Sequence, residues 1–339
     1  MIDGLLIKPL GFPWETYDPF LFCAFHHDTY PVGQSHLGPD PALLAGRRLG
    51  EDFGNKTGWN MYHGETIPGF PAHPHRGFET VTIAEKGLVD HSDSIGASGR
   101  FGNGDVQWMT AGRGVQHSEM FPLLNKEESN ELLLFQIWLN LPARSKMVKP
   151  HFAMFWNEKI PVVKQVNAQN RTSEIKLVAG QFENQKALNP APDSWAADDS
   201  NQVAIWIIHM EPNAELDLGQ VESSVNRTLY YYEGSGVEMN DAVVSSMHSI
   251  RIDSDQNLHV RNGDTRSYFL YLQGKPIAEP VAQYGPFVMN TQEEISNAFR
   301  EYQKTQFGGW PWPKHDHVHD TERGRFAIHA NGKEEIPGE

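Results

Sequence analysis

The chain has a single cysteine and no long apolar run. Because Cys23 has no second cysteine to pair with among the 339 residues, an internal disulfide is excluded, which suits a reducing compartment. No stretch approaches the roughly 20 apolar residues that a membrane-spanning helix needs. The first twenty residues lack a basic start followed by an apolar core, the pattern of a secretory signal. We therefore expect a soluble cytoplasmic protein with no membrane association.

Positive charge is also scarce. The sequence has 28 Lys and Arg against 43 Asp and Glu, which gives a formal charge of −15. A surface this acidic repels the phosphate backbone of nucleic acids, and no Lys/Arg run supplies a basic patch. Direct DNA or RNA binding is not expected.

Glycine, proline and aromatic residues are abundant, and they accompany short strand-like runs. The 30 Gly and 22 Pro suit many strands and turns, and runs such as "VTIAEKGLVD", "VAIWIIHMEP" and "SYFLYLQGKP" occur in both halves. This texture predicts an all-β protein of two tandem antiparallel β-barrels of the jelly-roll type. The expected domains are residues 1–145 and 146–290, with the polar, proline-bearing segment after Leu141 as the linker.

One helix is predicted near the end of the chain, in the region 291–339. Thr291 and Glu294 have the spacing of a capping box, and an apolar stripe that includes Ile295 and Phe299 follows them. Gly308 and Gly309 are expected to end the helix. The tail beyond it carries a histidine tract that we expect to be solvated (His315, His317 and His319).

Two pairs of polar residues have the spacing of neighbours on one face of a strand. His73 and His75 lie in "AHPHRGFETV", and His117 and Glu119 lie in "QHSEM". Residues i and i+2 of a strand point to the same side, so two such strands facing each other across a barrel would aim four donors at one point. Three imidazoles and a carboxylate favour iron, with copper, nickel, manganese or zinc as alternatives. The absence of thiolate ligands argues against a closed structural zinc site.

Each pair also has an ordinary explanation when it is taken alone. His117 and Glu119 could be a simple hydrogen-bonded pair, and Glu79 could cap a loop or pair with Arg76. The two pairs together favour the metal site. The remaining histidines lack such partners. In the segment before His73 we expect surface or gating residues (His26, His27, His36 and His63), and in the second half we expect surface or hydrogen-bonded core residues (His209, His248 and His259).

Three longer stretches carry a family resemblance. "HPHRGFETV", "GDVQWMTAGRGVQHSEM" and "GPFVMNTQEEI" resemble the signature stretches of the pirin family, within the cupin superfamily, and the resemblance runs from about Asp18 to Phe307. It implies a bicupin fold with a short C-terminal helix and one iron ion (Fe²⁺ or Fe³⁺) per chain, in the N-terminal barrel only. The implied ligands are His73, His75, His117 and Glu119, whereas Glu79 is not a ligand.

The resemblance implies two kinds of function. One is quercetin 2,3-dioxygenase activity, in which O₂ opens a flavonol ring with release of carbon monoxide and Glu119 takes the substrate's hydroxyl proton. The alternative is an iron-dependent, redox-sensing regulatory protein whose partner is a transcription factor or a metabolic enzyme. The segment 26–72 is longer than in compact members, and the tail resembles an extension of some bacterial members. Substrate choice is therefore not carried over.

Overall fold

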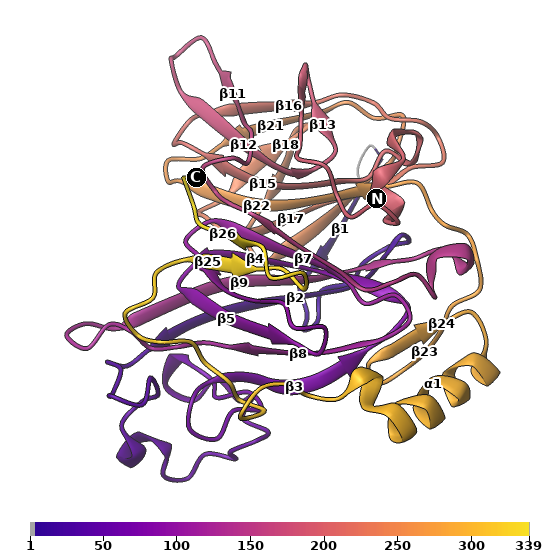
Figure 1. Cartoon of the computed structure of the whole chain (residues 1–339). Helices are drawn as coiled ribbons and strands as arrows, with labels where there is room; N and C mark the ends of the chain where they lie inside the picture. Colours follow the sequence, from indigo (N-terminus) through magenta and orange to yellow (C-terminus); the bar gives the residue numbers. More distant parts are fainter. Residues whose placement is uncertain (1–3, 339) are drawn as a thin grey trace. The chain divides into compact units, whose positions relative to one another are not determined.

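The computed structural model describes residues 4–338 and divides into two compact units (Figure 1). We call the unit made of Ala24–Glu158 and the chain from Glu279 onward the N-terminal barrel. The C-terminal barrel comprises the chain up to Cys23 together with Lys159–Ala278. Within the described residues, strands make up nearly all the regular structure and α1 (Gln292–Thr305) is the one α-helix. The predicted all-β class is confirmed.

The N-terminal barrel is built from two large antiparallel sheets. The first has the order β10-β7-β4-β9-β2 and the second β26-β25-β6-β5-β8-β3. Their strands are β2 (Phe20–Tyr30), β3 (Gly69–His75), β4 (Phe78–Lys86), β5 (Leu88–Asp93), β6 (Ser98–Gly102), β7 (Asp105–Thr110), β8 (Val115–Met120), β9 (Asn130–Asn140), β10 (His151–Phe155), β25 (Phe326–Ile328) and β26 (Glu334–Glu335).

Strand β4 shows how the sequence specifies this arrangement. Its residues are β-branched or aromatic at most positions and buried almost throughout, as expected of a central strand. Gly87 then turns the chain into β5 with a φ of +79°, which only glycine adopts readily. A Cβ at this position would lie 2.5 Å from the Glu131 carbonyl oxygen, so the strand pairing also needs glycine here.

The C-terminal barrel contains a seven-stranded and a four-stranded sheet. Their orders are β1-β20-β17-β22-β15-β12-β11 and β16-β21-β18-β19, and a small hairpin joins β13 to β14. The strands are β1 (Leu5–Pro9), β11 (Val162–Val166), β12 (Thr172–Ala179), β13 (Gln181–Phe182), β14 (Gln185–Lys186), β15 (Ala204–Met210), β16 (Glu215–Leu218), β17 (Asn226–Glu233), β18 (Val237–Met239), β19 (Ala242–Val244), β20 (His248–Ile252), β21 (Leu258–Asn262) and β22 (Ser267–Gly274). The runs that predicted strands in this half are all strands.

The units differ from the sequential ranges 1–145, 146–290 and 291–339 at both ends of the chain. Strand β1 belongs to the C-terminal barrel because it pairs with β20, and β25 belongs to the N-terminal barrel because it pairs with β6. The segment expected to link the barrels leads into β10 of the N-terminal barrel, which pairs with β7. Such long-range pairings leave no local signal in the sequence.

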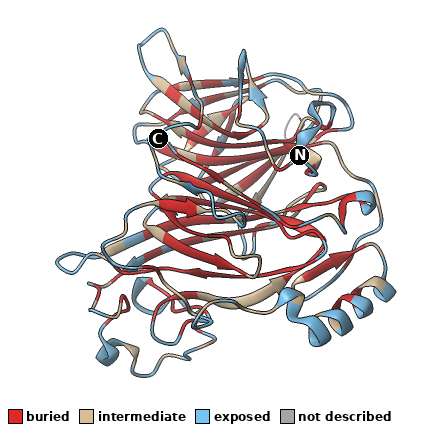
Figure 2. Cartoon of the chain, in the orientation of Figure 1, coloured by how far each residue is buried: buried red, intermediate tan, exposed pale blue. Residues whose placement is uncertain are grey.

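Helix α1 begins as the sequence predicted. Thr291 is its N-cap, and its hydroxyl accepts from the Glu294 amide while the Glu294 carboxylate accepts from the Thr291 amide, so the capping box is complete. The apolar stripe packs on the hairpin formed by β23 (Ala282–Tyr284) and β24 (Phe287–Met289). The helix ends at Thr305, before the predicted glycines, because Gln306 adopts the left-handed conformation. Its outer face is exposed, whereas the strands of both units are largely buried (Figure 2).

The segment 26–72 is an ordered excursion of the N-terminal barrel. The Arg47 guanidinium lies 2.7 Å from the buried Asp52 carboxylate and stacks over the Trp59 ring, which anchors the loop. Trp59 and Tyr62 join the apolar core of the barrel.

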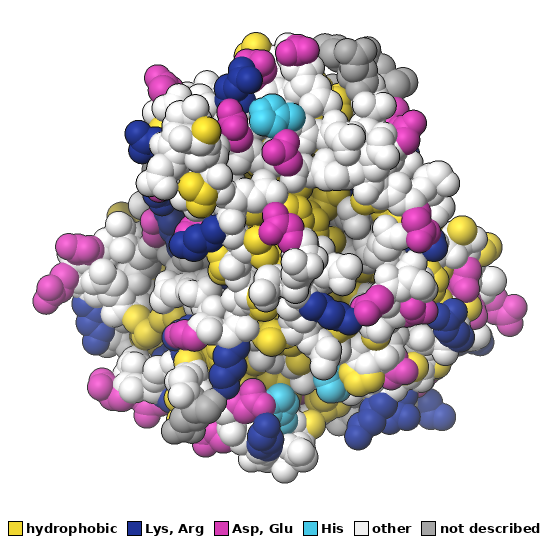
Figure 3. Space-filling model, turned by 90° about the horizontal axis from the view of Figure 1, so that it is seen from above, with side chains coloured by type: hydrophobic (Ala, Val, Ile, Leu, Met, Phe, Trp, Pro, Cys, Tyr) yellow, Lys and Arg dark blue, Asp and Glu magenta, His cyan; other side chains and the backbone are white. Residues whose placement is uncertain are grey.

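Two further features concern the outside of the molecule. On the face drawn in Figure 3, Lys and Arg are scattered among Asp and Glu rather than gathered in one patch. Among the described residues, no helix is long and apolar enough to cross a membrane.

Candidate metal centre

The two predicted donor pairs lie on neighbouring strands. β3 and β8 are hydrogen-bonded to each other, and His73 is directly opposite His117 in their register. The expectation that the two strands face each other across the barrel is therefore wrong, although three of the four predicted donors, the histidines, do converge. Directly paired residues of an antiparallel ladder share one face, so the side chains of both strands meet on the same side of one sheet.

The three histidines come together there. One ring nitrogen of each of His73, His75 and His117 lies within 4.8 Å of the others. Their ring centroids are 4.5–4.9 Å apart. The His73 Nδ1 atom is 2.9 Å from the Pro71 carbonyl oxygen, which orients that ring and leaves Nε2 for another partner. The His75 ring is held edge-on by Phe78 and Trp138.

The environment of these rings favours the neutral imidazole, which is the form that binds metals. Burial lowers the pKa of His73 to about 4 and holds the pKa values of His75 and His117 well below their usual range. The His117 ring is fully buried, and neither of its nitrogens has a hydrogen-bond partner within residues 4–338. An unsatisfied buried polar atom costs about 1–3 kcal/mol, so the surroundings of His117 suit a ligand that its ring would bind.

Glu119 stands beside the histidines and is held from the opposite sheet. Its Oε2 lies 3.7 Å from His117 Nε2. Thr82 of β4 donates to Oε1 at 2.9 Å, and Gln136 of β9 donates to Oε2 at 2.6 Å. Burial raises the pKa of Glu119, while the charge of His91 and these two hydrogen bonds act in the opposite direction. The carboxylate is thus fixed next to the imidazoles by both faces of the barrel.

Two further residues of the site were missed by the sequence reasoning. His91 pairs with Glu119 and Asp93 pairs with His117 in the β5–β8 register, so both lie on the same face as the donors. His91 Nε2 is 3.3 Å from Asp93 Oδ2, and both side chains are fully buried. The sequence did contain a pattern that could have revealed His91 and Asp93, because "HSD" at 91–93 has the same i, i+2 spacing as "HSE" at 117–119.

Other residues considered from the sequence lie elsewhere. The Glu79 carboxylate accepts from the Thr110 hydroxyl at 2.7 Å. Because side chains alternate along a strand, Glu79 lies on the opposite face of β4 from Phe78, Thr80 and Thr82. Arg76 pairs with Glu301 rather than with Glu79. Neither residue belongs to the cluster.

The segment 26–72 reaches the neighbourhood of the cluster. His63 and Phe53 both contact the Phe70 ring, and Phe70 contacts His73. His26 is buried, contrary to the expectation of a surface residue, because its Nδ1 lies 2.9 Å from the Tyr62 hydroxyl inside the barrel.

The histidine tract of the tail is solvated only in part, because His315 is exposed as expected whereas His317 is half-buried and His319 is buried against the barrel. The His315 carbonyl accepts from the Ala72 amide on β3, and the His319 side chain lies 2.9 Å from the His91 carbonyl on β5. The buried Arg100 side chain binds the Asp90 carboxylate and also donates to tail carbonyls, including that of Asp320. The tail thus braces the strands on both sides of β8.

Comparison with known proteins assigns the family. The pirin family model matches residues 49–139, and the model of the pirin C-terminal cupin domain matches residues 205–308. Pirin-1 of Arabidopsis thaliana is 37% identical over 254 residues, which cover 71% of this chain and 78% of the plant protein. The chain belongs to the pirin family. A Pseudomonas aeruginosa protein provisionally named quercetin 2,3-dioxygenase is 32% identical to this pirin over 241 residues, 70% of this chain and 79% of that protein.

The fold comparison agrees. The crystal structure of a quercetin 2,3-dioxygenase from Acinetobacter baumannii superposes with a TM-score of 0.67 and 28% identity, and the match covers 86% of this pirin and 87% of that chain. The bicupin architecture implied by the sequence resemblance is confirmed. The buried histidine cluster of this pirin has the chemistry of a metal site.

Proposed function

We propose that this pirin binds one iron ion per chain through His73, His75, His117 and Glu119 and opens flavonols of the quercetin type with O₂. The observation that carries the proposal is the group of three converging imidazoles, in which neither nitrogen of the buried His117 ring has a hydrogen-bond partner among the described residues. Three nitrogen donors and one carboxylate leave coordination positions open for substrate. Such a donor set suits a catalytic iron ion better than a structural zinc ion. The dioxygenase names of the relatives support the reaction class.

The residues around the cluster have distinct roles in this proposal. When bound, the metal supplies Lewis-acid and redox chemistry for a flavonol and O₂. The Glu119 carboxylate takes the proton of the 3-hydroxyl group, which makes the flavonol electron-rich enough to react with O₂. Both oxygen atoms of O₂ enter the product. The ring carbon that carried the 3-hydroxyl group leaves as carbon monoxide. Thr82 and Gln136 hold Glu119 in place for the proton transfer.

A further polar group is available to orient the substrate. Gln107 of β7 is opposite Thr82 in the register and therefore faces the same side of the sheet. It is fully buried, and neither atom of its amide has a partner within the described residues. Phe78 and Trp138, packed against His75, supply apolar surface for an aromatic ring. We assign Gln107 the hydrogen bond to a flavonol oxygen.

The test is an anaerobic preparation loaded with iron, given quercetin and then O₂, while carbon monoxide and quercetin absorbance are followed. We expect carbon monoxide in proportion to quercetin consumed, and none from the His117→Ala protein. An iron-loaded protein that leaves quercetin unchanged would overturn the dioxygenase proposal. Proteins co-purifying with that inactive but iron-loaded form would direct the search to the regulatory alternative.

A further inference from the structure

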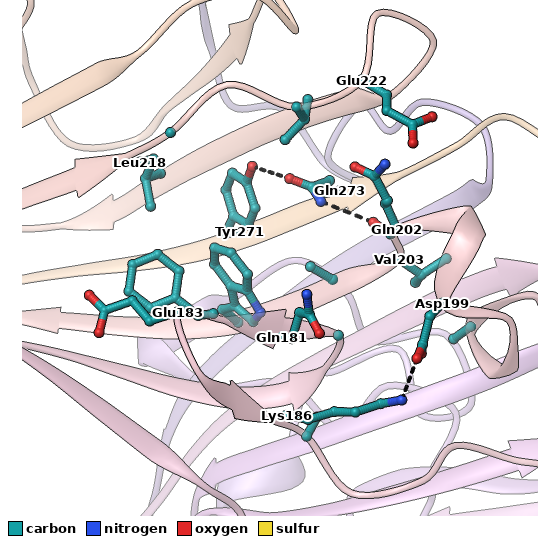
Figure 4. Close-up of a pocket in the computed structure, with 18 of the residues that line it drawn as sticks. Gln181, Glu183, Lys186, Asp199, Gln202, Val203, Leu218, Glu222, Tyr271 and Gln273 are labelled. Carbon is teal, nitrogen blue, oxygen red and sulfur yellow. Dashed lines mark hydrogen bonds and ion pairs between the residues drawn. The ribbon is translucent and has the colours of Figure 1, made fainter.

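The C-terminal barrel contains a cavity of its own, far in sequence from the histidine cluster. It has a volume of about 630 Å³. All of its lining residues come from the C-terminal barrel, among them the hairpin β13–β14 and strands β15 and β22 (Figure 4). This volume lies within the usual range of small-molecule sites, about 300–1,000 Å³.

Aromatic rings form one wall of the cavity. Trp206 of β15 and Tyr271 of β22 are directly paired, and their rings stack with centroids 4.6 Å apart. The Phe182 ring of the hairpin stands at 68° to Trp206, with centroids 5.1 Å apart. A wall of this kind offers ring faces and edges to a flat ligand.

The polar atoms of this wall are already engaged. Trp206 Nε1 donates to the Ala179 carbonyl at 3.1 Å. The Tyr271 hydroxyl donates to Gln273 Oε1, and Gln273 Nε2 donates to the Gln202 carbonyl, as the dashed lines in Figure 4 show. Burial raises the pKa of Tyr271 to about 12, so its hydroxyl stays neutral. The rings are therefore fixed in place before any ligand arrives, and they offer no charge.

The charged groups that line the cavity are mostly acidic. The one lysine, Lys186, is 2.6 Å from the Asp199 carboxylate and is neutralised by it. The five carboxylates are those of Glu183, Asp198, Asp199, Asp217 and Glu222. Lys275, which does not line the cavity, lies 3.0 Å from the Glu222 carboxylate and offsets its charge. The carboxylates still outnumber these two lysines, and the remaining negative charge repels carboxylate and phosphate ligands and attracts cations.

We infer that this cavity is a second small-molecule site, independent of the metal, that takes a flat aromatic cation. Its ring would lie against the aromatic wall of Trp206, Tyr271 and Phe182, where a positive charge is attracted by the ring electrons. The acidic rim would provide the long-range attraction. An uncharged ring of the same shape would bind more weakly, and an anionic one more weakly still.

The experiment compares three probes that share one bicyclic ring. N-methylquinolinium is the cation, quinoline the neutral compound and quinoline-2-carboxylate the anion. Each is titrated calorimetrically into the full-length protein after chelation has removed metal, so the histidine cluster contributes nothing through an ion. We expect the affinity to fall in the order cation, neutral, anion, with about a tenfold step between the cation and the anion.

Variants locate the binding. Phe182→Ala, at a partly buried position, should weaken the cation about tenfold, whereas Tyr284→Ala, an exposed aromatic outside the cavity, should change nothing. Glu222→Gln at the rim leaves Lys275 without its carboxylate partner and makes the rim less negative, which should reduce the preference for the cation. Glu238→Gln, an exposed carboxylate that pairs with Arg261 and does not line the cavity, is its control.

Three results would overturn the inference. The first is the absence of saturable N-methylquinolinium binding up to about 1 mM. The second is an affinity for the anion equal to that for the cation. The third is cation binding that is lost in His73→Ala but unchanged in Phe182→Ala and Glu222→Gln. None of these results depends on whether the protein cleaves flavonols.

Discussion

The Thr82 hydroxyl donates a 2.9 Å hydrogen bond to Glu119 Oε1 across the interior of the N-terminal barrel. Thr82 lies on β4 and Glu119 on β8, which belong to different sheets. The bond therefore ties the Glu119 carboxylate to the sheet opposite the one that carries the histidines. Partners of this kind set the orientation of a metal ligand, and their loss usually costs 10–100-fold in metal affinity.

We predict that Thr82→Val weakens iron binding by about 10–100-fold, because valine keeps the shape but cannot donate. Competition with a chelator measures the affinity. Thr80→Val is the matched control, since Thr80 is equally buried on the same face of β4 and its hydroxyl has no partner among the described residues. Equal affinities for both variants would remove Thr82 from the site.

Glu119→Gln tests the proton transfer. The amide keeps the shape and an oxygen donor but is a weaker ligand and a poor base. Even with iron fully loaded, turnover of quercetin should drop by about 10²–10⁴-fold, the usual cost of a lost general base. Raising the pH until the free flavonol ionises should restore part of the rate, because the substrate then arrives deprotonated. Normal turnover of the loaded variant at neutral pH would leave Glu119 without this role.

The sequence predicted the features that depend on local patterns. The strands, the capping box at Thr291 and the His73–His75 and His117–Glu119 pairs all follow from periodicity or spacing within a few residues. The contribution of Thr82 could not be foreseen, because it depends on which strands pair and which sheets face each other. The burial of His26 and the bracing by the tail have the same origin, since both depend on contacts between distant segments.

The bracing of the tail predicts a large cost for one substitution. Arg100→Met leaves the buried Asp90 carboxylate without its charged partner and the tail carbonyls without their donor. Removing one partner of a buried pair costs about 3–5 kcal/mol, which urea unfolding would measure. Arg48→Met, in an exposed pair with Glu51, should cost less than about 1 kcal/mol. Similar costs for the two variants would contradict the role of Arg100.

His26 should make the protein sensitive to acid. Burial lowers its pKa from 6.5 to about 4, so the folded state resists protonation while the unfolded state accepts it. The contribution of the neutral His26 to the free energy of unfolding is fully present above pH 6.5. It is lost as the pH falls toward 4, and the loss amounts to up to about 3 kcal/mol.

The variant His26→Asn provides the comparison. Its amide can still donate to the Tyr62 hydroxyl but does not titrate, so the gap in unfolding free energy between wild type and variant should narrow between pH 6.5 and 4. A gap that stays constant with pH would show that His26 titrates normally.

Metal analysis tests the central claim most directly. The wild type, the triple variant His73→Ala/His75→Ala/His117→Ala and a tail control, His315→Ala/His317→Ala, would be purified without an affinity tag, loaded with iron and freed of excess. We predict about one equivalent of iron in the wild type and the tail control, and almost none in the triple variant, with circular dichroism unchanged because the barrel core carries the stability of a domain this size. A full equivalent of iron retained by the triple variant would contradict the assignment.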